Sequence, residues 1–108
     1  MENINNFNSV SIGQIVYVKK GRGKSNPFIV VNLDKDFLYL VDGDTRKLEK
    51  PKKKNKKHIQ IVNQIDYNIK KKLEEKLYLL DADIRKALKP YKNNTNINAN
   101  SQKKAISN

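Results

Sequence analysis

The chain has no cysteine, no second histidine and no long apolar run. The absence of cysteine excludes disulfide bonds, thiolate catalysis and cysteine-ligated zinc. A membrane-spanning helix needs roughly 20 consecutive apolar residues, and no segment approaches that length. Residues 1–6 are polar and carry an acid, whereas a secretory signal begins with cations and continues with an apolar core. We therefore expect a cytoplasmic protein that does not enter the membrane.

Catalytic and metal-ligating groups are equally scarce. His58 stands among lysines, with no partner for a metal and no spacing that assembles a nucleophile, a base and an orienting acid. Asp42 and Asp44 flank a glycine, where turn chemistry accounts for them. The segment 21–25 lacks the Gly-x-x-x-x-Gly-Lys-Ser/Thr spacing of a nucleotide-binding loop. We expect no enzymatic activity, no metal site and no cofactor.

Positive charge, in contrast, is in excess. The chain has 23 Lys and Arg against 11 Asp and Glu, which gives a formal net charge of +12. Such an excess indicates a polyanionic partner, with nucleic acid before an anionic membrane surface. The 108 residues suffice for one small domain with tails, and domains of this size bury too little surface for a large cleft.

A first basic loop lies between two predicted strands, 15–18 and 28–31. Both segments are β-branched and aromatic runs that suit a half-buried pleated surface. The glycines Gly21 and Gly23 allow positive φ or a close approach to a ligand. The cations of this loop are Lys19, Lys20, Arg22 and Lys24. The loop can grip a phosphate backbone, or it can be a solvated hairpin loop.

A second basic block spans residues 46–58 and holds eight cations and one acid. Its cations are Arg46, Lys47, Lys50, Lys52, Lys53, Lys54, Lys56 and Lys57. Together with the first loop, this block predicts a continuous RNA-binding face, and a solvated lysine loop is the alternative. Lysine acts as a point charge, so the face should hold phosphates more than read bases. Arg22 and Arg46 can fork onto a phosphate or stack on a base, although Arg46 can instead pair with Asp42 or Asp44.

Four aromatic residues of the predicted strands can in principle stack on bases. They are Tyr17, Phe28, Phe37 and Tyr39. In so small a β unit we expect them to be core residues, with Tyr39 as the best candidate for stacking.

Three further strands are predicted after the first two. Residues 37–41 form the third, Asp42-Gly43 is typical of a type I′ hairpin, and residues 45–48 form the fourth. Pro51 interrupts the pattern because it cannot donate to a ladder. Residues 58–62 close the sheet as a fifth strand, with Ile59 and Ile61 facing inward. Five short strands fit a small barrel, of the SH3-like or the OB-like type.

The periodicity changes to that of a helix after residue 63. Apolar residues recur every four positions from Ile65 to Leu77 and predict one helical face. We expect a second short helix with Asp81 as its N-cap and Pro90 as its end. Its apolar face is made of Ile84, Ala87 and Leu88.

This reading divides the chain into four parts. Residues 1–9 form a flexible N-terminal tail, 10–62 a β barrel, 63–91 a two-helix extension and 92–108 a disordered tail.

Three blocks of residues, in order, carry a family resemblance. Gly13-x-x-Val16-Tyr17-Val18, the basic Gly21-Arg22-Gly23-Lys24 loop and the segment 27–31 resemble a KOW motif, as found in large-subunit ribosomal proteins and transcription elongation factors. The segments 41–54 and 83–90 are similar to those of small bacterial KOW-domain RNA-binding proteins. These proteins are in turn similar to KOW-containing large-subunit proteins of archaea and eukaryotes. The resemblance covers about residues 10–91.

The resemblance implies an SH3-like barrel, a structured ribosomal RNA target and a role in translation or ribosome assembly. The large ribosomal subunit and its RNA are the expected partners. The alternative is a protein-interaction module of the translation or transcription machinery, in which the helix from Ile65 to Leu77 docks on a partner protein. Non-specific DNA binding is a third possibility.

Overall fold

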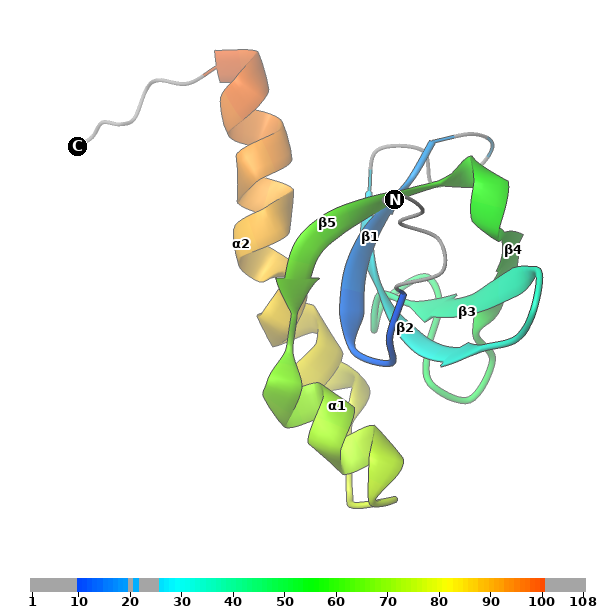
Figure 1. Cartoon of the computed structure of the whole chain (residues 1–108). Coiled ribbons are helices and arrows are strands. Elements are labelled where there is room, and N and C mark those ends of the chain that lie inside the picture. Colours follow the sequence, from blue (N-terminus) through cyan, green and yellow to red (C-terminus); the bar gives the residue numbers. More distant parts are fainter. Residues whose placement is uncertain (1–9, 20, 22–25, 101–108) are drawn as a thin grey trace.

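The chain forms a five-stranded antiparallel sheet followed by two helices (Figure 1). The structure is a computed structural model that describes residues 10–19, 21 and 26–100, with side chains up to residue 92. The elements are β1 (Gln14–Val18), β2 (Pro27–Leu33), β3 (Phe37–Val41), β4 (Lys52–Asn55), the 3-10 helix η2 (Lys56–His58), β5 (Ile59–Ile65), α1 (Tyr67–Glu74) and α2 (Asp81–Asn100). The predicted mainly β architecture with two helices after it is confirmed. Within the described residues, neither helix is long and apolar enough to cross a membrane.

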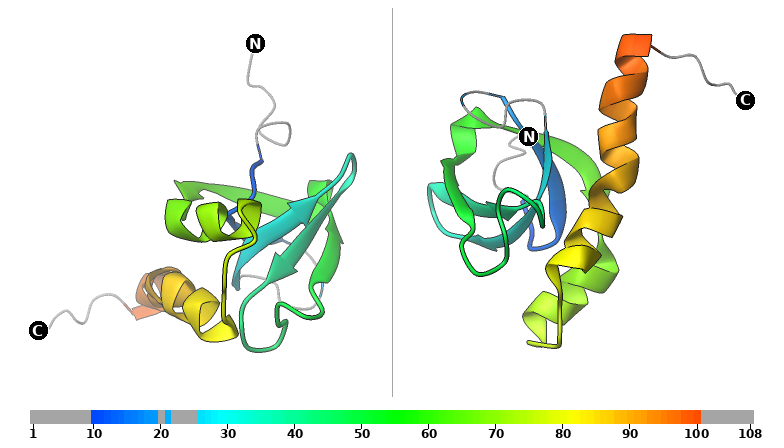
Figure 2. Two further views of the ribbon diagram at one scale, coloured as in Figure 1. Left: turned by 90° about the horizontal axis from the view of Figure 1, so that it is seen from below. Right: turned by 180° about the vertical axis from the view of Figure 1, so that it is seen from behind.

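The sheet curls so that its two edge strands are consecutive in the chain. The strand order is β4-β3-β2-β1-β5, and the three-residue η2 joins the two edges. The register shifts between Gln14 and Val16 in the β1–β5 pair and between Val30 and Asn32 in the β2–β3 pair. Such irregularities bend a strand and increase its twist. Figure 2 shows the resulting curved sheet from two further sides.

Apolar residues cover both faces of the sheet and form two clusters. The inner cluster, inside the curl, contains Val10, Val16, Val18, Phe28, Val30, Leu38, Leu40 and Ile59. The outer cluster, between the sheet and the helices, contains Ile15, Ile29, Val41, Ile69, Ile84 and Leu88. This arrangement explains why β1 and β2 read as nearly continuous apolar runs, as strands buried on both faces do. The expectation of half-buried strands is therefore wrong for most of β1 and β2.

The fourth strand lies later in the chain than the pattern predicted. Residues 45–48 are a loop, and β4 is Lys52–Asn55. The Asp42 carboxylate accepts from the N–H groups of Asp44 and Arg46 and from the Thr45 hydroxyl, at 2.9, 2.8 and 2.6 Å. It thereby organises a wide loop in place of a two-residue type I′ hairpin. Leu48, the apolar residue of this segment, is partly buried against the outer cluster and is not part of a strand.

The first helix is shorter than its apolar repeat suggested. Ile65 pairs with Gln14 in the sheet, and the Asp66 carboxylate caps α1 by accepting from the Ile69 N–H at 3.0 Å. The helix ends at Glu74, and the chain turns at Lys76, which has a φ of 56°. The predicted helical face from Ile65 to Leu77 is therefore right only for its middle, Ile69 and Leu73.

The second helix is longer than predicted and passes through Pro90 to Asn100. A proline removes one helical hydrogen bond, and the Tyr17 hydroxyl, which donates to the Tyr91 carbonyl at 2.9 Å, holds the helix against β1 beyond that point. The predicted end at Pro90 is wrong, and residues 92–100 are helical where a disordered tail was expected. Asp81 is the first helical residue and not the N-cap, and its carboxylate accepts from the Leu48 N–H at 2.7 Å.

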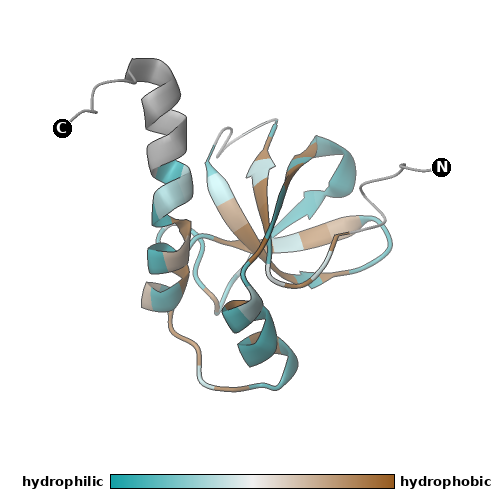
Figure 3. Ribbon diagram, turned by 60° about the vertical axis from the view of Figure 1, so that its left-hand side comes forward, coloured by the Kyte–Doolittle hydropathy of each residue, from teal (hydrophilic) through white to brown (hydrophobic). Residues whose placement is uncertain are grey.

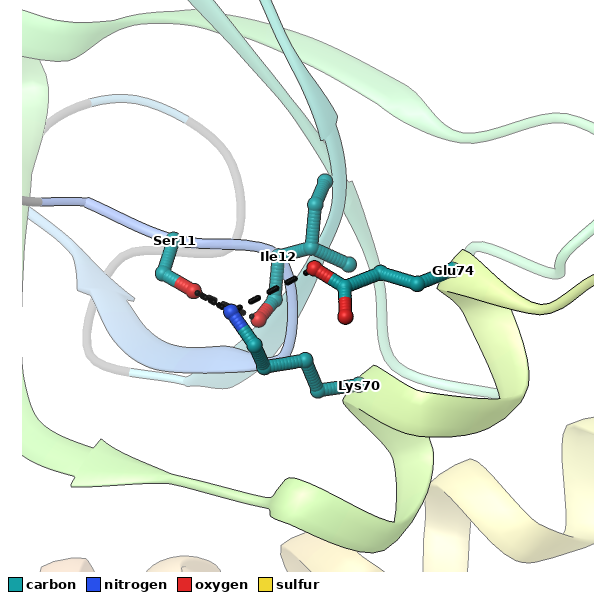
Figure 4. Close-up of polar contacts among 4 residues, drawn as sticks. All are labelled: Ser11, Ile12, Lys70 and Glu74. Carbon is teal, nitrogen blue, oxygen red and sulfur yellow. Dashed lines mark hydrogen bonds and ion pairs between the residues drawn. The ribbon is translucent and has the colours of Figure 1, made fainter.

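A lysine on α1 fastens that helix to the segment that enters β1. Lys70 Nζ donates to Ser11 Oγ at 2.9 Å and pairs with the Glu74 carboxylate at 3.4 Å (Figure 4). The Ser11 hydroxyl in turn donates to the Ile12 carbonyl at 2.9 Å. This contact fixes the start of β1 and, through β1, the position at which the first basic loop begins.

Candidate nucleic-acid interface

The edge strand β4 consists of three lysines and an asparagine. Its register places Lys52 across from Leu40 and Lys54 across from Leu38, two fully buried residues of the inner cluster. Directly paired residues point to the same side of a sheet, so these lysines border the inner cluster. Lys53, which pairs with Tyr39, lies on the outer face. A strand of lysines is stable here because lysine stems are apolar and only their charged ends need water.

Two lysines of β4 lie over aromatic rings. Lys52 Nζ is 5.7 Å from the ring centroid of Phe28, and Lys53 Nζ is 4.4 Å from that of Phe37. A cation at such a distance is attracted by the negative face of the ring. An aromatic ring does not neutralise the charge of an ammonium group, so the contact with Phe37 leaves the positive charge of Lys53 in place.

The third lysine of β4 reaches the first basic loop. Lys54 Nζ lies in the space where a Gly21 side chain would be, 2.9 Å from the position of a Cβ built there. Gly21 has a φ of 87°, so the chain turns sharply at this point. Two basic segments far apart in the sequence are therefore neighbours in the structure.

The end of β1 lies beside η2. Lys19 is exposed, and its N–H donates to the His58 carbonyl at 2.8 Å. The other predicted cations of this loop, Lys20, Arg22 and Lys24, lie outside the described residues.

The lysines of η2 differ from each other. Lys56 Nζ donates to the Lys35 carbonyl at 2.9 Å, which orients this side chain toward the turn after β2. Lys57 is exposed, and its N–H donates to the Asn55 side chain at 3.0 Å. Lys57 thus extends the cationic edge of β4, whereas Lys56 also serves as a structural tie.

The remaining cations of the second block belong to a different element. Arg46, Lys47 and Lys50 lie in the loop before β4, which is held against the start of α2 because Arg85 Nη1 donates to the Gly43 carbonyl at 2.7 Å. The backbone N–H of Arg46 donates to the Asp42 carboxylate. Its guanidinium makes no ion pair among the described residues. The cations of the second block thus lie on two elements, the loop 46–50 and the strand β4 with η2, and the continuous face stays a prediction.

Asp42 is the buried anion beneath this loop, with 6% of its surface exposed. Burial alone would raise its pKa, but the bonds from Thr45, Arg46 and Asp44 and the charge of Lys92 outweigh burial and lower the pKa. The carboxylate is therefore ionised and holds the loop in one conformation.

No protein-family model matches the chain, and no curated protein matches it significantly. The chemistry of the surface has to be argued from its own residues.

The sequence pattern did not predict that two aromatic residues of β3 lie outside the core. Phe37 and Tyr39 alternate with the buried Leu38 and Leu40, which puts both aromatic rings on the outer face of β3, where they are partly buried. The Tyr39 hydroxyl donates to Asp34 Oδ2 at 3.0 Å, a bond that raises the pKa of Tyr39. The alternation of aromatic and aliphatic residues from 37 to 40 was the available signal, because only one set can face the inner cluster.

The predicted RNA-binding residues also do not include the exposed cations of α2. They are Arg85, Lys86 and Lys89. The signal was the absence of acids after Asp83 along the rest of that helix.

Proposed function

We propose that this protein is a non-catalytic RNA-binding protein of the cytoplasm, with structured ribosomal RNA as its target and a role in translation or ribosome assembly. The observation that carries the proposal is the position of Lys54 Nζ against Gly21, which joins the two basic segments. Like charges held together repel one another, so such a group is most stable when an anion neutralises it. RNA, with a phosphate at every nucleotide, is the polyanion that suits an extended row of lysines.

We further propose that the sheet is an SH3-like barrel of the KOW type. The curled sheet supports this assignment, because its edges β4 and β5 are separated by η2 alone. The resemblance of residues 10–91 to KOW-domain proteins is the second support. In this fold the barrel serves to hold the basic segments in a fixed relation.

The proposed mechanism is electrostatic. Lys52, Lys54 and Lys57 hold adjacent phosphates together with Lys19, and the predicted Lys20, Arg22 and Lys24 extend this row. The loop of Arg46, Lys47 and Lys50 supplies a second point of contact. Binding of this type positions RNA and carries little sequence information.

RNase treatment of a cell extract tests this function. The proposal expects the protein to co-sediment with ribosomal subunits and to be released by RNase. Direct competition between ribosomal RNA and duplex DNA then separates RNA binding from general polyanion binding. Equal affinity for both nucleic acids would contradict the proposed target.

One observation favours a protein-interaction module as a second candidate. Apolar side chains are exposed around α1 and the segment after it, where Tyr67 and Tyr78 are 70% and 81% exposed and Leu77 and Leu80 are 49% and 45% exposed. Figure 3 shows the apolar stretch that joins the two helices. Exposed apolar groups of this size often mark protein contacts. An RNase-resistant complex that is lost on replacing Tyr78 and Leu77 with serine would favour this candidate.

A further inference from the structure

The helices leave one part of the outer face of the sheet uncovered. They pack over Ile15, Ile29 and Val41 in the outer cluster. Phe37 and Tyr39 lie on the same face of β3 as Val41, but neither belongs to that cluster, and both are only partly buried. The part of the outer face that the two helices do not cover is therefore aromatic, and its rings are partly accessible to water.

The turn after β2 fixes the Tyr39 ring in place. Its hydroxyl donates to Asp34 Oδ2 at 3.0 Å, while Asp34 Oδ1 accepts from the N–H groups of Phe37 and Asp36 at 2.9 and 3.1 Å. The Phe37 bond is the main cause that lowers the pKa of Asp34, so the acceptor remains ionised. A ring held in this way loses little freedom when a ligand stacks on it.

A cation stands beside these rings. Lys53 pairs directly with Tyr39 across the β3–β4 ladder, and its ammonium lies 4.4 Å from the Phe37 centroid. The neighbours of Lys53 in the strand, Lys52 and Lys54, border the other face. Because β4 is an edge strand, a nucleic acid backbone that follows it meets lysines from both faces.

We propose that Tyr39, flanked by Phe37 and Lys53, binds an unpaired base of a single-stranded RNA segment. The base stacks on the Tyr39 ring, and Lys53 holds the phosphate beside it. A ring supplies stacking energy for any base, so this contact selects unpaired over paired RNA and not one sequence over another. The inference rests on the proposed RNA binding and adds the kind of RNA segment that the surface prefers.

The test compares Tyr39→Leu with the matched control Tyr39→Phe, which keeps the ring and loses only the bond to Asp34. The probes are a single-stranded oligonucleotide, a duplex RNA of equal length and an abasic oligonucleotide with the same number of phosphates. Tyr39→Leu should weaken single-strand binding by roughly 5- to 150-fold, the range expected for loss of a base–aromatic stack. Tyr39→Phe should retain most of the single-strand binding, because it keeps the stacking ring and loses only the bond that orients it. Thermal unfolding of both variants reports whether the fold is retained.

The abasic probe separates the outcomes. If the base stacks on Tyr39, the variant Tyr39→Leu should bind the abasic probe as tightly as the wild type does. The same should hold for the duplex probe. If Tyr39→Leu lost affinity equally for all three probes, or for none of them, the inference would be overturned, while phosphate binding would remain in place. A wild-type protein that binds none of the probes would instead refute the proposed RNA binding. Lys53→Ala should weaken the binding of both the single-stranded and the abasic probe, since it removes a side chain that holds a phosphate.

Discussion

Lys54 on the fourth strand places its ammonium against Gly21 in the loop that follows the first strand. The two residues are far apart in the sequence, and the curl of the sheet β4-β3-β2-β1-β5 brings them together. The fold thereby concentrates positive charge at the rim of the inner cluster. Such a concentration costs folding energy in the free protein, which a polyanion offsets when it binds.

Replacing Lys54 with alanine should weaken binding to every RNA sequence by a similar factor. The reason is that a lysine contacts phosphates, which all sequences share. Fluorescence anisotropy with three RNAs of equal length and different sequence measures this. Lys71→Ala, an exposed lysine on α1, is the control and should have little effect. A change of sequence preference without loss of affinity would mean that Lys54 contacts a base.

Replacing Gly13 with alanine should destabilise the fold by about 2–4 kcal/mol, because backbone strain and overpacking add up. Gly13 has a φ of 87°, and a Cβ there would lie 2.8 Å from Lys70 Cβ and 3.0 Å from the Asp66 carbonyl oxygen. Urea denaturation measures the change. Gly21→Ala is a matched control, since Gly21 has the same φ but faces only the mobile end of Lys54. Equal losses for the two variants would show that packing against α1 contributes nothing.

Stability should fall in acid partly through Asp42. Its pKa is lower in the folded protein than in the unfolded chain, so the unfolded chain binds more protons as the pH falls. The stability from this group is complete above the ordinary carboxyl range near pH 4 and is lost as the pH falls through that range toward the folded pKa.

The variant Asp42→Asn tests this linkage. It should lower the free energy of unfolding at pH 7 by about 1–3 kcal/mol and flatten its dependence on pH below about 5. Unfolding by urea at several pH values measures both effects. Asp44→Asn is the control, because Asp44 is exposed. An unchanged pH profile in Asp42→Asn would contradict the assigned role.

Replacing Lys76 with glycine should stabilise the protein by about 0.5–1 kcal/mol. Lys76 is a non-glycine residue with a φ of 56°, at the turn that ends α1, where the Leu77 N–H donates to the Lys72 carbonyl at 2.8 Å. Glycine adopts this conformation without the Cβ penalty and is the usual residue at such helix ends. Thermal unfolding measures the gain. Lys71→Gly, a substitution inside the same helix, should instead lower the free energy of unfolding by about 1 kcal/mol.

The residues of β3 could be predicted from the sequence, whereas those of β4 could not. Phe37 to Val41 is a run of strand-forming residues bounded by turns, which makes the local signal sufficient. Lys52 to Asn55 has no such signal, because it is a strand only through its pairing with β3 and the apolar stems of its lysines. The local pattern favoured residues 45–48, whose apolar member Leu48 packs against the helices instead.

The ends of the helices depended on contacts that the sequence does not reveal. Proline commonly ends a helix, yet the bond from the Tyr17 hydroxyl to the Tyr91 carbonyl supports α2 beyond Pro90. Ile65 is the first residue of the predicted apolar repeat but belongs to β5. Asp66, a good N-cap residue directly after Ile65, was the signal that could have marked the true start of α1. The twelve predicted cations could be named from the sequence, but the contact of Lys54 with Gly21 required the fold.

The salt dependence of ribosomal RNA binding tests the central claim most directly. If about five phosphates are neutralised, the plot of log affinity against log salt concentration should have a slope between roughly −3.5 and −4.5. Lys54→Ala should reduce the magnitude of that slope by about 0.7–0.9, since it removes one phosphate contact. A wild-type slope near zero, or a slope that Lys54→Ala leaves unchanged, would contradict an electrostatic grip centred on β4 and Gly21.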